Sequence, residues 1–164
     1  MGTRSRIGIE HLNGTIESIY CHWDGDFDWN GKMLHDAYQD INKIKSLIKL
    51  GNISALRENV DPVHEGHDFE SPHEDVVIAY SRDREETGQE ALVSESRESF
   101  LERCGKSGEE FVYLFVEKEN QWLASEIEIS NYDDLTTFEI KLNPLTEVLE
   151  EYKPSLLDNT CLEI

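Results

Sequence analysis

Basic residues, cysteines and long apolar runs are all scarce in this sequence. Of its 164 residues, 15 are Lys or Arg and 35 are Asp or Glu, which gives a formal charge of −20. So acidic a chain has little net attraction for nucleic-acid phosphates or for an anionic membrane, and we expect it to bind neither unaided. Its apolar runs are too short for a membrane span, and its opening lacks the pattern of a secretory signal.

The few cysteines exclude a disulfide framework. Cys21, Cys104 and Cys161 are odd in number and lie far apart in the sequence. This usage is typical of a reducing, intracellular compartment. No strong catalytic signature accompanies the thiols, and we expect no cofactor.

The negative charge is concentrated in two segments. Residues 1–60 carry 7 basic and 8 acidic side chains, so this part is nearly neutral. Residues 61–90 and residues 126–164 each carry 10 acidic and 2 basic side chains. Such asymmetry is typical either of a solvated acidic surface or of a face presented to a basic partner. The second interpretation raises the question whether the two segments share one face.

Hydrophobic periodicity predicts an α+β fold, with an antiparallel sheet built from hairpins and two or three packed helices. Asn13-Gly14 predicts a two-residue hairpin turn that places Glu10 opposite Glu17. Further strands are expected at residues 76–80, 111–116, 121–129 and 136–142, and helices at 33–48, 90–103 and 145–152. We expect residues 1–125 to form a single domain, with 126–164 as an acidic strand and helix extension of it.

Three short motifs stand in the first half of the chain. They are Met-Gly-Thr-Arg-Ser-Arg-Ile at 1–7, Tyr-Cys-His-Trp-Asp-Gly at 20–25, and Asn30-Gly31 followed by Leu-Gly-Asn-Ile-Ser-Ala-Leu at 50–56. The motifs resemble a family of small, functionally uncharacterised bacteriophage and prophage proteins. This resemblance implies a phage origin and the cytoplasm of a host cell, and it implies no activity. The chain departs from the family pattern at residues 26–28, where relatives tend to have Tyr-Pro.

The loop after the second motif carries part of a calcium-binding pattern. Asp26, Asp28, Asn30 and Gly31 match the first half of a calcium loop, but Ala37 stands where a bidentate carboxylate is required. We favour a run of Asx turns that starts the following helix.

A second metal-like cluster lies in the acidic stretch of residues 59–75. His64, His67 and His73 stand there among several carboxylates, which could bind a divalent ion. The cluster has no cysteine partner and no clear helix to order it. We favour a solvated acidic loop, and we expect no metal site.

Around the Cys-His-Trp-Asp-Gly motif, a small pocket is an alternative site. Cys21 and His22 are adjacent on a strand and point to opposite faces, which argues against a thiol nucleophile with its base. A small metal-dependent enzyme or a nucleotide-binding protein would instead use a histidine-rich pocket with nearby arginines. Its residues would be His11, Tyr20, His22, Asp24, His35, Arg82 and Arg84.

Three aromatic residues crowd the same loop. Trp23, Phe27 and Trp29 lie within seven positions of one another. Aromatic residues at this density indicate either a binding surface or a cap over the open end of the core.

Our principal hypothesis is a non-enzymatic phage protein that binds and inhibits a host or anti-phage defence protein. Rows of carboxylates can imitate the charge of nucleic acid and occupy a basic groove. The expected partner therefore has a basic surface, and a homodimer is also compatible with the sequence. The expected acidic contacts, beside the three aromatic residues, are Glu126, Glu128, Asp133, Asp134, Glu139, Glu147, Glu150 and Glu151.

Overall fold

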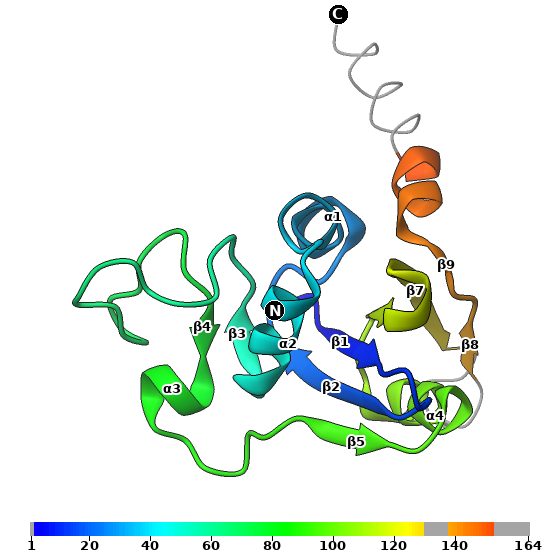
Figure 1. Cartoon of the computed structure of the whole chain (residues 1–164), viewed down its shortest axis with the longest axis horizontal. Coiled ribbons are helices and arrows are strands. Elements are labelled where there is room, and N and C mark those ends of the chain that lie inside the picture. Colours follow the sequence, from blue (N-terminus) through cyan, green and yellow to red (C-terminus); the bar gives the residue numbers. More distant parts are fainter. Residues whose placement is uncertain (1, 130–137, 153–164) are drawn as a thin grey trace, which may run out of the picture.

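Two hairpins meet at the centre of the sheet. β1 (Ser5–Glu10) pairs antiparallel with β2 (Ile16–Cys21), and β6 (Phe111–Val116) pairs antiparallel with β7 (Gln121–Ile129). β1 and β6 then run side by side in parallel, which joins the hairpins into one sheet (Figure 1). The structure, a computed structural model, describes residues 2–129 and 138–152.

Shorter strands extend the sheet on both sides, and the strand order is β4-β3-β2-β1-β6-β7-β8. The added strands are β3 (Ile53–Ala55), β4 (Ile78–Ala79), β8 (Phe138–Ile140), β5 (Leu92–Ser94) and β9 (Asn143–Pro144). β5 pairs with β2, and β9 pairs with β7. The mixed α/β class agrees with the sequence. The sheet is larger than expected, and it includes two parallel pairings, β1 with β6 and β2 with β3, that hairpins alone cannot make.

Helices cover both faces of the sheet, because alternate strand residues point to opposite sides. α1 (Lys32–Ala37), α2 (Ile41–Lys49) and a helix at residues 145–152 contribute to the core on one face. α4 (Arg97–Ser107) contributes Phe100 to the core on the other. The short helices are η1 (Phe27–Gly31), α3 (Tyr80–Arg84) and η2 (Glu117–Glu119). None of the helices within the described ranges has the length and apolar character needed to cross a bilayer.

The register of the first hairpin differs from the prediction by one residue. The His11 amide donates to the Thr15 carbonyl at 2.8 Å, so three residues form the loop. Gly14 takes the left-handed conformation there with φ of 91°, as loops of this length require. Glu17 consequently lies opposite Ile9, and the predicted Glu10–Glu17 pair does not form. The predicted second hairpin at residues 111–129 is confirmed.

The helix predicted at residues 33–48 is broken at Tyr38. The Trp122 indole donates to the Tyr38 carbonyl at 2.8 Å, and this removes an acceptor that a continuous helix would use. The Asn42 amide instead donates to the Asp40 side chain at 2.8 Å, which caps α2 as a new helix.

The helix predicted at residues 90–103 begins later than expected. Residues 92–94 form β5, and Ser96 accepts a hydrogen bond from the Ser99 amide at 3.1 Å to start α4. The expected boundary between the domain and its acidic extension, at residues 125 and 126, lies within β7. The first residues of the acidic extension, 126–129, are therefore part of the sheet.

The two acidic segments flank opposite edges of the sheet. The first segment, residues 61–90, begins in the connection between β3 and β4, at one end of the strand order, and continues through β4 and α3. The second segment begins within β7 and continues into β8, at the other end. Figure 1 shows the connection between β3 and β4 on one side of β1 and β2, and β8 on the other. The described parts of the segments therefore do not form one acidic face.

Candidate functional site

The candidate site begins where β7 leaves the core. Trp122 and Ala124 are buried on the face that α1 and α2 cover. Two and four residues further on, on the same face, Glu126 and Glu128 are exposed. The side chains on this face thus change from apolar to anionic within one strand.

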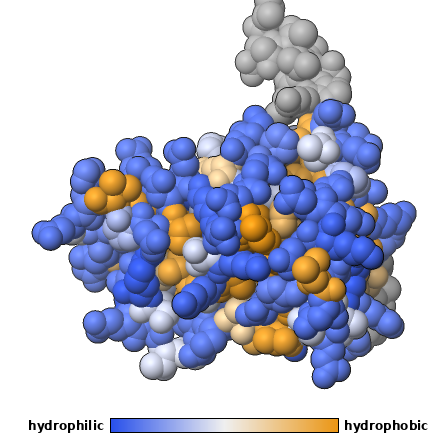
Figure 2. Space-filling view, viewed as in Figure 1, coloured by the Kyte–Doolittle hydropathy of each residue, from blue (hydrophilic) through white to orange (hydrophobic). Residues whose placement is uncertain are grey.

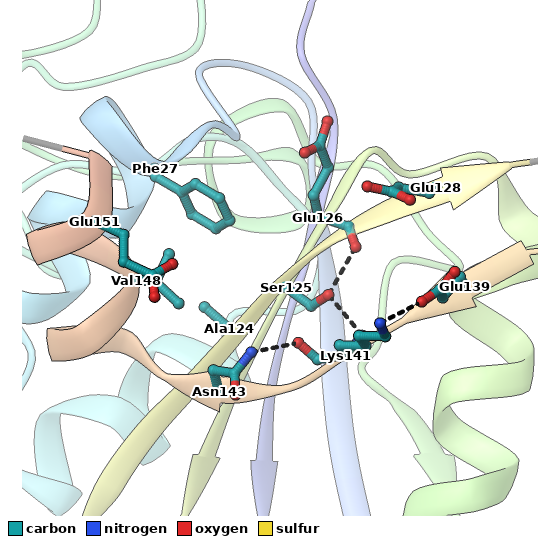
Figure 3. Close-up of a pocket in the computed structure, with 10 residues that line it drawn as sticks. All are labelled: Phe27, Ala124, Ser125, Glu126, Glu128, Glu139, Lys141, Asn143, Val148 and Glu151. Atoms are coloured by element: carbon teal, nitrogen blue, oxygen red, sulfur yellow. Dashed lines mark hydrogen bonds and ion pairs between the residues drawn. The ribbon is translucent and has the colours of Figure 1, made fainter. Parts of the chain in front are cut away.

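These glutamates lie in a hollow of about 330 Å³, which we call the acidic hollow (Figure 3). It is lined by Phe27, Ala124, Ser125, Glu126, Glu128, Glu139, Lys141, Asn143, Val148 and Glu151. Four of the ten lining residues are glutamates and one is a lysine, so the hollow is negative overall. It presents acidic groups from two strands and a helix around a partly apolar wall.

Two of the glutamates form an unfavourable pair. Glu128 on β7 is directly opposite Glu139 on β8. Side chains at opposite positions of antiparallel strands are close enough for like charges to repel. Lys141 Nζ lies 2.9 Å from a Glu139 oxygen, and this hydrogen bond, followed by the charges of Glu139 and Glu128, raises the pKa of Lys141. Among the described residues that line the hollow, one cation, Lys141, accompanies four carboxylates.

The helix at residues 145–152 forms another wall. Leu145 and Leu149 are buried in the core, which leaves Glu151 at the rim of the hollow. The Tyr152 ring packs edge-on to Phe27 with ring centroids 6.0 Å apart. Burial raises the pKa of Tyr152, and the carboxylates of Asp28, Asp26 and Glu126 raise it further.

Phe27 connects the acidic hollow to the aromatic loop. Its ring packs edge-on against Phe111, with centroids 4.9 Å apart, and it also contacts Tyr113. The Tyr113 hydroxyl donates to the Gly25 carbonyl at 2.6 Å and fixes the loop to β6. Phe27 is therefore an anchor inside the loop as well as a wall of the hollow.

The two tryptophans of the loop face outward. Trp23 is 43% exposed and Trp29 is 65% exposed, although the Trp23 and His22 rings pack in a T-shaped arrangement. Large aromatic side chains left in water are typical of binding surfaces. The three predicted aromatic contacts thus divide into one packed anchor and two exposed residues.

The predicted acidic contacts divide in a similar way. Glu126, Glu128, Glu139 and Glu151 line the acidic hollow. Glu147 and Glu150 are exposed on the same helix as Glu151, outside the lining. Asp133 and Asp134 lie outside the described residues.

Sequence reasoning missed the polar residues that hold the hollow together. The Lys141 amide donates to Ser125 Oγ at 3.0 Å, and this bond ties the chain after β8 to β7. Lys141 could have been noticed, because it is one of only two basic residues in the segment 126–164. Asn143 and Ser125 gave no such signal.

The calcium-like residues do not form a calcium loop. Asn30 is buried, and its amide donates to Trp23 O at 3.2 Å and to Cys21 Sγ at 3.4 Å. Asp26 has one buried oxygen without a hydrogen-bond partner, and burial, followed by the charge of Asp28, raises its pKa. The segment forms η1, a π-helical turn, in place of the predicted Asx turns.

The residues of the alternative pocket lie apart, although Tyr20 and His22 meet, with Oη 2.7 Å from Nδ1. His11 pairs with Glu17, and His35 pairs with Asp36. Arg82 contacts Asp83 and Arg84 contacts Glu86, while Asp24 lines a separate hollow beside Trp29. The structure therefore does not assemble the seven residues into one site.

The histidine-rich loop is held by hydrogen bonds. The His73 amide donates to Nδ1 of His67 at 2.9 Å. The other nitrogen of the His67 ring lies 3.2 Å from Asp83, and both side chains are buried. His64 is exposed. Within the described ranges, no three His, Cys, Asp or Glu side chains are arranged to hold a metal ion.

No family model, curated protein or solved structure matches this chain. The resemblance to phage proteins therefore remains an expectation from the sequence motifs. A function has to be inferred from the residues of the acidic hollow and the loop beside it.

Proposed function

We propose that this protein is a non-enzymatic phage protein that binds a basic surface of a host or anti-phage defence protein and inhibits it. The observation that carries the proposal is the convergence of four glutamates on the acidic hollow. Glu128 and Glu139 face each other there despite their repulsion. A basic partner would relieve this repulsion. Part of the free energy that the repulsion costs in the free protein would therefore be regained on binding.

The charge of the hollow also suggests how inhibition would work. Three of its carboxylates lie on two adjacent strands and the fourth on the helix at residues 145–152, and the whole chain carries a charge of −20. Such a surface attracts a nucleic-acid-binding groove over long range and speeds the encounter. A partner held in this way cannot bind nucleic acid through the same groove.

The exposed tryptophans add an apolar contact to this electrostatic one. Trp29 lies on the η1 turn, whose first residue, Phe27, lines the acidic hollow. Tryptophan residues commonly supply much of the binding energy in a protein interface, while charged groups supply orientation and rate. We therefore propose that Trp29 belongs to the same interface as the acidic hollow.

The proposal is tested with fluorescein-labelled octalysine and a panel of purified basic DNA-binding domains. Binding is measured by anisotropy from about 50 mM to about 300 mM salt, with duplex DNA as competitor. We expect affinity to fall steeply with salt and duplex DNA to displace the protein from its partner domain. The proposal is contradicted if neither octalysine nor the basic domains bind, or if their affinity does not change with salt.

A triple variant locates the binding site. Glu126→Gln, Glu128→Gln and Glu151→Gln together remove three charges from the acidic hollow. We expect the dissociation constant for octalysine to rise about tenfold or more, since each lost contact with a charged group costs about 0.5–1 kcal/mol.

A matched control keeps the total charge equal. Glu65→Gln, Glu70→Gln and Glu74→Gln remove three exposed charges from the acidic loop at the opposite edge of the sheet. We expect this control to change affinity by about twofold or less, because these charges act only through screened long-range attraction. Equal losses in the two triple variants would show that only net charge matters.

Removal of a positive charge from the acidic hollow tests the role of Lys141. Lys141→Gln removes the basic group that pairs with Glu139 at 2.9 Å. We expect octalysine to bind more tightly to this variant, because its own cations then meet the unpaired carboxylates. Weaker binding would show that Lys141 organises the hollow and does not compete with the partner.

A further inference from the structure

β5 is a short strand at an open edge of the sheet. Its residues 92–94 pair antiparallel with residues 16–18 of β2. Within the described ranges, β5 has no second strand partner. Figure 1 shows β5 at the lower margin of the molecule, with no element beyond it. A strand in this position presents backbone donors and acceptors to any extended chain that approaches.

The strand also exposes two adjacent apolar side chains. Leu92 is 40% exposed and Val93 is 60% exposed. Figure 2 shows an apolar patch over β5 at the lower margin of a largely hydrophilic surface. Proteins usually protect such an edge with lysine, proline or a covering loop. Residues 92–94 contain no lysine and no proline.

Carboxylates surround this apolar edge. Glu90 and Glu95 flank the strand and are exposed, and Glu17 lies opposite Val93 on β2. A hollow of about 270 Å³ beside the start of β5 is lined by Glu17, Glu90 and Ala91, with Lys49 from α2 also at its wall. An added strand could place a basic side chain in this hollow.

We propose that β5 receives an extended, basic segment of a partner protein as an additional strand. The open edge would supply backbone hydrogen bonds, and the flanking glutamates would select a segment with alternating basic and apolar residues. A second copy of the chain is disfavoured, because it would bring Glu90 and Glu95 of each copy together between two molecules of charge −20.

This edge is separate from the acidic hollow. Ser5, Phe111 and Glu126 stand in register at one end of β1, β6 and β7, close to the hollow. β5 pairs with Ile16, which belongs to the other end of the central hairpin. The two sites can therefore be tested independently.

The probe is a fluorescent peptide of four Lys-Val repeats with blocked termini. It is measured against the Glu126→Gln, Glu128→Gln and Glu151→Gln variant, so that the acidic hollow contributes little. A version of the peptide that is N-methylated at every residue keeps the charge and loses the amide donors on both edges. We expect it to bind about tenfold more weakly, and equal affinity would overturn strand addition.

Protein variants then place the peptide on β5. We expect Val93→Lys to weaken binding of the unmodified peptide about tenfold, because it adds a like charge at the edge. The matched control is Leu12→Lys, at a position that is 71% exposed in the first hairpin loop. It adds the same charge, and we expect a change of about twofold or less. Equal losses in both variants would overturn the assignment to β5.

Two further measurements complete the test. A Glu-Val peptide of the same length is expected not to bind, and its binding would contradict the selection by charge. Sedimentation velocity tests the competing occupant, a second copy of the chain. A dimer that disappears in Val93→Lys would overturn the proposal, whereas a monomer at all concentrations supports it.

Discussion

Glu128 and Glu139 face each other across β7 and β8, and Lys141 balances only part of their charge. A protein optimised for stability alone would pair opposite charges at these positions. This arrangement therefore links the stability of the sheet edge to the proposed binding of a basic partner.

We expect Glu128→Gln to stabilise the protein while weakening its binding to octalysine. Removal of the like-charge pair should raise the free energy of unfolding by about 0.5 kcal/mol. Urea denaturation at low salt measures this gain, and Glu65→Gln in the distant loop is the control. A loss of stability in Glu128→Gln would show that the attraction of Glu128 to Lys141 outweighs its repulsion from Glu139.

We expect Tyr113→Phe to loosen the aromatic loop. The Tyr113 hydroxyl is buried and donates to the Gly25 carbonyl, so its removal leaves that carbonyl without its donor. The free energy of unfolding should fall by about 1–2 kcal/mol. Tyr152→Phe, at a more exposed ring, is the control and should have little effect. A pH titration of the tyrosine absorbance provides a second measurement, because burial raises the pKa of Tyr113 well above its ordinary value of 10.0.

We expect Asp83→Asn to destabilise the loop of residues 59–75 in a pH-dependent manner. Burial favours the protonated acid, but hydrogen bonds from Arg82, the Ala79 amide and His67 prevail and lower the pKa of Asp83. A lowered folded-state pKa means that its stabilising contribution is complete above the ordinary value of 3.8. The contribution is lost as the pH falls through the folded-state value.

Urea denaturation of the natural chain and of Asp83→Asn between pH 7 and pH 2 measures this effect. At pH 7 the variant should be less stable by about 1–3 kcal/mol, and the difference should shrink toward the acid end. A constant difference across the range would show that Asp83 stabilises the loop without its charge.

We expect the buried ion pair between Arg6 and Glu109 to behave as a unit. The Arg6 Nε lies 2.7 Å from Glu109 Oε1, and both residues are almost fully buried. Arg6→Met alone should cost about 3–5 kcal/mol, because it leaves the Glu109 carboxylate buried and unpaired. Adding Glu109→Gln should recover part of this loss. A double-mutant cycle by urea denaturation measures the coupling, and additive losses would rule it out.

We expect the two buried thiols to react only when the protein unfolds. Burial raises the pKa of Cys21 to about 11 and that of Cys104 to about 12. In a Cys161→Ser variant at pH 8, a thiol reagent should label the native protein slowly and the urea-unfolded protein at once. Rapid labelling of the native protein would indicate that one of the two sites opens readily.

Local patterns in the sequence predicted the central part of the fold. Alternating apolar residues and a short polar turn were sufficient for the hairpin of β6 and β7, because both signals lie within the hairpin itself. The break between α1 and α2 could not be predicted in this way. It depends on the Trp122 indole, which is 84 residues away from Tyr38 in the chain.

The candidate site could also be predicted only in part from the sequence. Sequence alone located the acidic residues and the aromatic loop, because charge and composition are properties of the chain. Only the tertiary structure brought Phe27, Glu139 and Glu151 around β7, since their contact depends on strand pairing and helix packing.

The sequence by itself determined the charge of −20 and its division between two segments. The tertiary structure decided that these segments flank opposite edges of one sheet, so only the second contributes to the acidic hollow. The physical reason is the parallel pairing of β1 with β6. This pairing places the two hairpins side by side. The chain that follows each hairpin therefore continues at a different edge of the sheet.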